Sequence, residues 1–74
     1  MDYTERMREL REENNYSQKE ISELLGIAQT TYSGYETGNR SIPIDIFIRL
    51  CDFYDISADY LMGLSDVRKP LIYM

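Results

Sequence analysis

The sequence predicts an all-α fold of five helices packed around one core. Three observations lead to this class: apolar residues recur at helical spacing, strand-like alternation is scarce, and capping residues and glycines divide the chain into five segments. The 74 residues are enough for one domain. We therefore expect residues 1–64 to form this domain and residues 65–74 to be a C-terminal tail.

The first helix is expected from Asp2 to about Asn14. Asp2 and Glu5 can serve as a capping pair at its start, three residues apart. Its apolar face is built at positions i, i+4 and i+7, by Tyr3, Met7 and Leu10. The "NNY" sequence that follows ends the helix.

A capping box opens the second helix, because Glu20 follows Ser17 by three residues. Gly26 is expected to end this helix, and its apolar face is expected to hold Ile21, Leu24 and Leu25. A short link leads to a third helix over 29–37, closed by Gly38. Two helices of about eight residues joined by a short turn that contains glycine constitute a helix-turn-helix.

The fourth helix is expected from Ile44 to Tyr54, with Pro43 at or beside its first position. Its core face holds Phe47, Leu50, Cys51 and Tyr54. Ile46 and Phe53 lie off that face and form a second apolar flank. Either the fifth helix or the tail covers this flank, or it belongs to a subunit interface.

The fifth helix is short. Ser57 is placed to cap its start, Met62 is its last residue and Gly63 stops it. The residues after it, "LSDVRKPLIYM", are expected to form no folded element.

Composition excludes several classes of function. The chain has no histidine, and its acids show no spacing that marks a buried catalytic pair, so we do not expect an enzyme. No run approaches the roughly 18 apolar residues of a membrane span. The single cysteine, Cys51, cannot form an internal disulfide and is expected to be buried. We expect a cytoplasmic protein without metal or cofactor.

The third expected helix has an unusual outward face. Tyr32 and Tyr35 form a stripe that must face the core. The opposite arc is neutral and rich in hydroxyl and amide groups: Gln29, Thr30, Ser33, Gly34 and Thr37. Such a face suits the DNA major groove, where amides and hydroxyls meet base edges and carboxylates would be repelled by phosphates. Small polar residues on an ordinary solvated helix remain the alternative at this point.

The segments "LREENNYSQKEISELLGIAQTTYSGYETGNRSIP" and "CDFYDISADYLMG" resemble the Cro/repressor-type, or XRE-like, helix-turn-helix transcriptional regulators. The features that carry the resemblance are Gln18 early in helix two, the Gly26 turn and the Glu36-Thr37-Gly38 end of helix three. The resemblance covers about residues 4–64. It implies a lambda-repressor-like DNA-binding domain.

The resemblance also implies a role for individual positions. Arg11 and Glu36 match a structural ion pair of the family. Two larger sets match DNA contacts. The base-reading positions are Gln29, Thr30, Ser33 and Gly34, and the phosphate contacts are Gln18, Lys19, Asn39 and Arg40.

The sequence departs from the family pattern at several of its positions. Ala28 stands where the family often has a serine or threonine cap, and Gly34 offers no side chain to a base. Asn39 stands where a lysine is common, and Ser22 replaces a small alanine, so its hydroxyl needs a backbone acceptor.

The function implied is a sequence-specific regulator of transcription. We expect a repressor that binds a palindromic operator on double-stranded DNA as a homodimer, with the helix 29–37 in the major groove. The dimer could form through the fifth helix, through the Ile46 and Phe53 flank, or through the terminal "PLIYM". The net charge of −5 leaves a second hypothesis, a protein-interaction module such as an antitoxin or antirepressor that uses the same fold to bind a partner protein.

Overall fold

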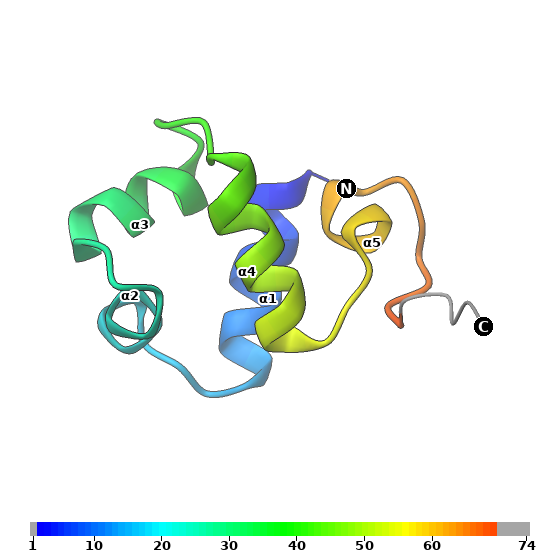
Figure 1. Cartoon of the computed structure of the whole chain (residues 1–74), viewed down its shortest axis with the longest axis horizontal. Helices are drawn as coiled ribbons and strands as arrows, with labels where there is room; N and C mark the ends of the chain where they lie inside the picture. Colours follow the sequence, from blue (N-terminus) through cyan, green and yellow to red (C-terminus); the bar gives the residue numbers. More distant parts are fainter. Residues whose placement is uncertain (1, 70–74) are drawn as a thin grey trace.

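The computed structural model describes residues 2–69, which form five α-helices and no strand (Figure 1). The helices are α1 (Tyr3–Glu13), α2 (Gln18–Leu25), α3 (Gln29–Thr37), α4 (Ile44–Tyr54) and α5 (Ala58–Met62). The all-α class and the five expected helices are confirmed. No helix of this part of the chain is long and apolar enough to cross a membrane.

Local capping explains why the helices begin and end where they do. The Ser17 hydroxyl accepts from the Glu20 N–H at 3.0 Å, and the Glu20 carboxylate accepts from the Ser17 N–H at 2.9 Å. Ser57 caps α5 with a single bond, accepting from the Tyr60 N–H at 3.0 Å. Gly26 ends α2 in the left-handed region, with φ of 71°. Asp2 caps α1 by accepting from the Thr4 N–H, but within residues 2–69 no reciprocal bond to Glu5 accompanies it, so the expected capping pair is not formed.

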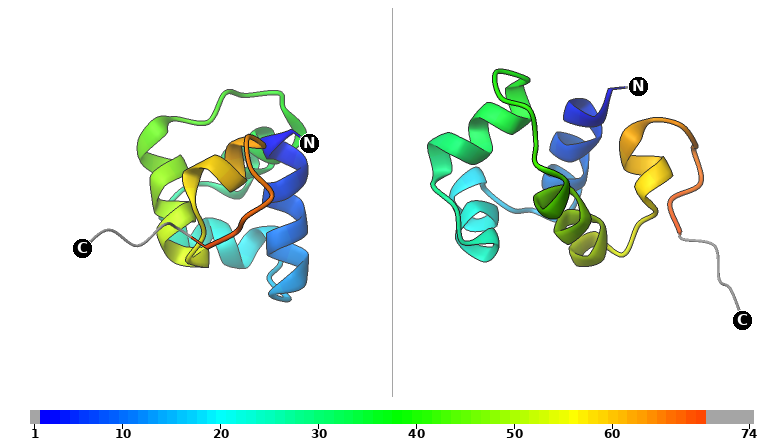
Figure 2. Two further views of the ribbon diagram at one scale, coloured as in Figure 1. Left: turned by 90° about the vertical axis from the view of Figure 1, so that its right-hand side faces the viewer. Right: turned by 45° about the horizontal axis from the view of Figure 1, so that its top comes forward.

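Along the longest axis α1 and α4 occupy the middle of the molecule, with α2 and α3 at one end and α5 at the other (Figure 1), and in the view along that axis α1 and α4 lie on opposite sides (Figure 2, left). Side chains from every helix meet between them. The most completely buried are Met7, Ile21, Ser22, Tyr32, Leu50 and Leu61. The core therefore joins the helix-turn-helix to the rest of the domain.

The prediction for the apolar face of α2 was wrong at Leu24, whose side chain is 52% exposed. The helix turns Ser22 toward the core instead, and Ser22 is buried together with Ile21 and Leu25. The Ser22 hydroxyl donates to the Lys19 carbonyl at 2.8 Å, as expected for a buried hydroxyl. On a helical wheel Ile21, Leu25 and Ser22 span about 100°, and Leu24 lies about 60° outside this buried arc.

The second apolar flank of α4 is not a continuous surface. Ile46 is buried in the core, whereas Phe53 is 40% exposed. The Phe53 ring packs against Tyr16 and Tyr54, with centroids 5.5 and 5.1 Å away. The flank is thus divided between the core and a small aromatic cluster.

The described part of the tail, residues 65–69, has no helix but is held against the domain. Nη1 of the buried Arg6 donates to the Tyr60 and Ser65 carbonyls, each at 2.7 Å, and Nη2 donates to Asp66 at 2.9 Å. Arg68 makes two bonds to the Glu13 carboxylate, at 2.6 and 2.7 Å. Sequence reasoning missed Arg6, because its position beside Met7 is the only signal that it faces inward.

Candidate nucleic-acid interface

The turn between α2 and α3 consists of Gly26, Ile27 and Ala28. The Ile27 N–H donates to the Ser22 carbonyl at 3.0 Å, which sets the direction of the chain as it leaves α2. α3 then runs across the end of the molecule (Figure 2). The expected helix-turn-helix is formed.

α3 has an inner and an outer face. Tyr32 is fully buried and Tyr35 is nearly so. Gln29 and Thr30 are exposed, and Ser33 is half-buried. The tyrosines therefore anchor the helix inward, as predicted, and its amide and hydroxyl groups lie outward.

The only carboxylate of α3 is turned away from the outer face. Arg11 Nε donates to Glu36 Oε2 and Arg11 Nη2 to Glu36 Oε1, each at 2.9 Å. Gln18 Nε2 donates to the same Oε1 atom at 3.2 Å. This cluster ties α1 and the start of α2 to the last turn of α3, and it leaves the outer face of α3 without a negative charge.

The surroundings of Glu36 keep it ionised. Burial by itself would raise the pKa of the Glu36 carboxyl. The hydrogen bonds from Arg11 and Gln18 and the positive charge of Arg11 outweigh burial, so the pKa lies below its ordinary value. The bond to Glu36 also raises the pKa of the Arg11 guanidinium. The expected Arg11–Glu36 pair is thus present as an ion pair.

Gly34 and Arg40 are in contact. Gly34 is buried, because the Arg40 side chain lies over it, while Arg40 itself is exposed. A Cβ atom at position 34 would lie 2.9 Å from Arg40 Cδ and 3.0 Å from Cγ. The bare backbone that was expected to face a base is therefore covered by a side chain from the following loop.

The remaining predicted DNA contacts are exposed. Lys19 lies in the first turn of α2, and Asn39 lies in the loop directly after α3. The structure brings Gln18 to α3 through Glu36, but no hydrogen bond within residues 2–69 links the Lys19 or Asn39 side chain to that helix. Their roles stay predictions.

The first turn of α3 has no side-chain cap. Ala28 is the N-cap residue, with extended backbone angles, and offers no oxygen to the first amides of the helix. By contrast, serine hydroxyls cap α2 and α5. The sequence predicted that Ala28 provides no side-chain cap, and the structure has none there.

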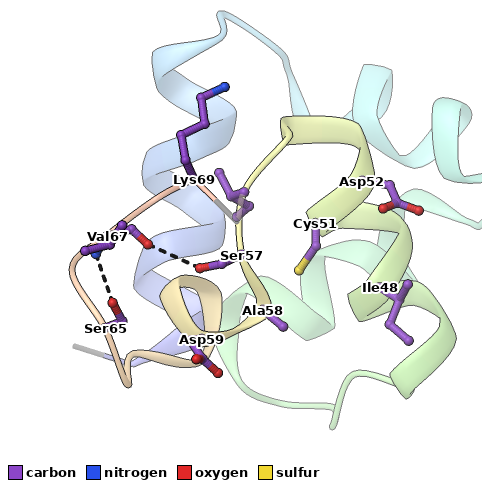
Figure 3. Close-up of a pocket in the computed structure, with 10 residues that line it drawn as sticks. Ile48, Cys51, Asp52, Ser57, Ala58, Asp59, Ser65, Val67 and Lys69 are labelled. Carbon is purple, nitrogen blue, oxygen red and sulfur yellow. Dashed lines mark hydrogen bonds between the residues drawn. The ribbon is translucent and has the colours of Figure 1, made fainter. Parts of the chain in front are cut away.

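A hollow of about 500 Å³ lies at the other end of the molecule, between α4, α5 and the described part of the tail (Figure 3). Ile48 and Cys51 line it from α4, Ala58 from α5 and Val67 from the tail. Burial raises the pKa of the Cys51 thiol. Within residues 2–69, no three acidic or cysteine side chains gather as a metal site would require.

Comparison with known proteins relates the chain to transcriptional regulators. Residues 7–61 match the helix-turn-helix family. The chain is 36% identical over 70 residues to the uncharacterized HTH-type transcriptional regulator YobD of Bacillus subtilis, covering 95% of this chain and 62% of YobD. It is 41% identical over 65 residues to the HTH-type transcriptional regulator AnsR of the same organism, covering 88% and 56%.

A more distant relative is the cryptic phage CTXphi transcriptional repressor RstR of Vibrio cholerae. The two are 28% identical over 66 residues, which is 89% of this chain and 60% of RstR. The chain thus spans between about half and three-fifths of the length of these relatives.

Proposed function

Because the chain belongs to the Cro/repressor-type helix-turn-helix family, we propose that it is a sequence-specific DNA-binding repressor that binds a palindromic operator as a homodimer. One observation carries the proposal: the outer face of α3 is neutral, since its only carboxylate is buried and paired with Arg11. An ordinary solvated helix gains nothing from removing charge, whereas a helix in the major groove must not present carboxylates to phosphates. The name of the relative RstR supports repression as the outcome.

The base contacts come from Gln29 and Thr30 in the exposed first turn of α3 and from Ser33, one turn after Gln29. Gln29 can donate and accept at the same adenine edge, and Thr30 and Ser33 can bond either base or contact the thymine methyl group. The buried tyrosines fix the backbone of the helix beneath this face, so only the base-reading side chains have to be ordered when DNA binds.

Phosphate contacts come from the edges of this surface. Gln18 stands in the first turn of α2, where free backbone amides favour an anion. Its side chain already donates to Glu36, so it can position α3 and contact a phosphate with its remaining groups. Lys19 is exposed next to Gln18, and Asn39 is exposed in the loop after α3. With so few cations, binding should weaken with salt along a shallow slope.

A homodimer is proposed because one recognition helix contacts only a few base pairs and a two-fold pair doubles that number. Of the surfaces expected from sequence, the Ile46 and Phe53 flank is divided by the core, and "PLIYM" lies outside the described residues. Within residues 2–69, the surface that we favour is the one around α5. Ile48 and Val67 line its hollow and are 51% and 62% exposed (Figure 3). A second copy packed there would remove them from water.

The same proposal places the protein in the cytoplasm, where its DNA is, and assigns it no enzymatic activity. Its partners are double-stranded DNA and a second copy of the chain. No cofactor is included in the proposal.

Selection of duplexes from random DNA by the purified chain, followed by sequencing, tests the function. We expect enrichment of one two-fold symmetric sequence with half-sites about one helical turn apart. Titrating that duplex at several salt concentrations should give two chains per duplex and a shallow salt dependence. Failure to enrich any sequence would contradict the proposal and favour the protein-interaction alternative.

A further inference from the structure

The loop after α3 returns Arg40 to the helix it has just left. Gly38, with φ of 84°, turns the chain, and the Arg40 N–H donates to the Gly34 carbonyl at 3.1 Å. The Arg40 side chain then lies on the Gly34 backbone, with Nε 3.4 Å from where a Cβ atom would be. Backbone and side chain of Arg40 are thus both placed by Gly34.

The backbone conformation at position 34 does not require a glycine. Its φ is not positive, unlike those of Gly26 and Gly38, so any residue could adopt its backbone angles. Glycine is a poor helix former, and the middle of a nine-residue helix is a costly place for it. A side chain at position 34 would occupy the space that Cγ and Cδ of Arg40 now fill. A local rule broken in this way marks a functional constraint.

The Arg40 guanidinium remains available to a ligand. No carboxylate within residues 2–69 forms a salt bridge with it, in contrast to the paired Arg11 and Arg68. Its apolar stem is held against α3 while its charged end is exposed. Position 34 lies one turn after Thr30 on the same face of α3. The Arg40 guanidinium is therefore on the same face as Thr30, a proposed base-reading residue.

We propose that Arg40 is a base-reading residue and that Gly34 is the positioning residue that seats it, with the guanidinium donating to O6 and N7 of a guanine in the major groove. The inference rests on the proposed function. The family resemblance implied a phosphate contact for Arg40. A loop side chain can contact a phosphate without packing against the recognition helix. To reach a base edge, it has to pack against the helix that enters the groove. The planar fork of arginine matches guanine, which makes this pair the commonest specific contact.

The test compares Arg40→Ala, Arg40→Lys, Gly34→Ala and the double variant Gly34→Ala/Arg40→Ala with wild type, by selection from random DNA and by titration of the selected duplex. In wild type we expect a guanine in each half-site whose replacement weakens binding roughly 5- to 150-fold. Each variant should lose most of that preference and keep the preferences at other positions. Lysine keeps the charge but not the fork, so Arg40→Lys should retain affinity for scrambled DNA.

Gly34→Ala is the decisive variant. Alanine favours the helix, so the protein should melt at the wild-type temperature or above while guanine preference falls. Because both changes act through one contact, the double variant should lose no more than Arg40→Ala alone. Arg49→Ala, at an exposed position of α4, is the control for loss of one positive charge and should leave guanine preference unchanged.

Three results would overturn the inference: equal weakening of all sequences by Arg40→Ala, wild-type guanine preference in Gly34→Ala, or additive losses in the double variant. Each presupposes that the wild-type chain enriches a sequence. Absence of any enrichment would contradict the proposed function itself, so the two failures are distinguishable.

Discussion

Nε and Nη2 of Arg11 donate to the two oxygens of Glu36, each at 2.9 Å, and join α1 to the last turn of α3. The side chains are 14% and 3% exposed. The same arginine donates to the Tyr16 carbonyl at 2.9 Å through Nη1. One side chain thus links three segments of the chain and keeps the carboxylate of α3 away from its outer face.

Removing one partner of this pair should be costly. Glu36→Ala leaves the Arg11 charge buried without compensation, and we expect a loss of about 3–5 kcal/mol in the free energy of unfolding, measured by urea denaturation. The pair between Arg68 and Glu13 provides a control, since it also has two hydrogen bonds, from Nη1 and Nη2, but both side chains are 46% exposed. Glu13→Ala should cost about 1 kcal/mol or less. Equal losses in the two variants would show that burial of the Arg11 pair contributes nothing.

Stability should fall in acid partly through Glu36. Its pKa in the folded protein lies below the ordinary value of 4.5, so its contribution is fully present above pH 4.5 and is lost as the pH falls toward the folded value. Glu36→Gln cannot titrate. The difference in unfolding free energy between wild type and this variant should therefore shrink from pH 6 to pH 3. A difference that stays constant over that range would contradict a lowered pKa.

Tyr54 gives the opposite dependence at alkaline pH. Burial raises its pKa from 10.0 to about 12, so its contribution to stability is present below pH 10 and is lost between pH 10 and 12. Its buried hydroxyl has no hydrogen-bond partner within residues 2–69. Tyr54→Phe should thus be as stable as wild type at pH 7 or more stable by about 1 kcal/mol. It should also lose less stability than wild type over the alkaline range, as followed by circular dichroism. A clear loss of stability at pH 7 would show that the hydroxyl has a partner in solution.

Ala28→Ser should stabilise the protein by about 0.5–2 kcal/mol. The backbone of Ala28 is already extended, as an N-cap requires, and a serine hydroxyl there could accept from the free amides of the first turn of α3. Thermal melting measures the gain. Ser17→Ala is the reverse control, because it removes a cap that the structure contains, and it should lower the melting temperature. An unchanged or lowered melting temperature in Ala28→Ser would mean that the first turn of α3 differs from the one described.

Gln29→Ala should weaken binding to the selected operator by about 1–3 kcal/mol and relax the preference at one base pair. Gln29 is exposed at the first position of α3, where alanine is readily accepted, so folding should be unaffected. Titration of the operator and of a scrambled duplex separates the effects. Equal weakening on both duplexes would remove Gln29 from the base-reading set.

Much of the architecture could be predicted because its signals are local. Ser17 and Glu20 are three residues apart and bond each other's backbone, whatever the rest of the chain does. Gly26 takes its left-handed angles at the end of α2 for an equally local reason. The family resemblance added the Arg11–Glu36 pair, which no spacing in the sequence could have indicated, since the partners are 25 residues apart.

The errors concern which residues the core covers. Leu24 is exposed although it lies beside the apolar face of α2, because a helical wheel shows only the average apolar direction. At Ile46 the sequence left two outcomes open, and the structure buries this side chain in the core. The burial of Arg6 depends on carbonyl groups of Tyr60 and Ser65, more than 50 residues away. No pattern within one helix predicts such a contact.

The sequence by itself determined the five helices, the turn that joins α2 to α3 and the inward direction of Tyr32 and Tyr35, since caps, glycines and helical periodicity act between residues a few positions apart. Only the tertiary structure decided that Arg6 is buried against the Tyr60 and Ser65 carbonyls and that Leu24 lies outside the core. Both outcomes depend on which other segments lie around a helix, and that arrangement exists only once the helices have packed.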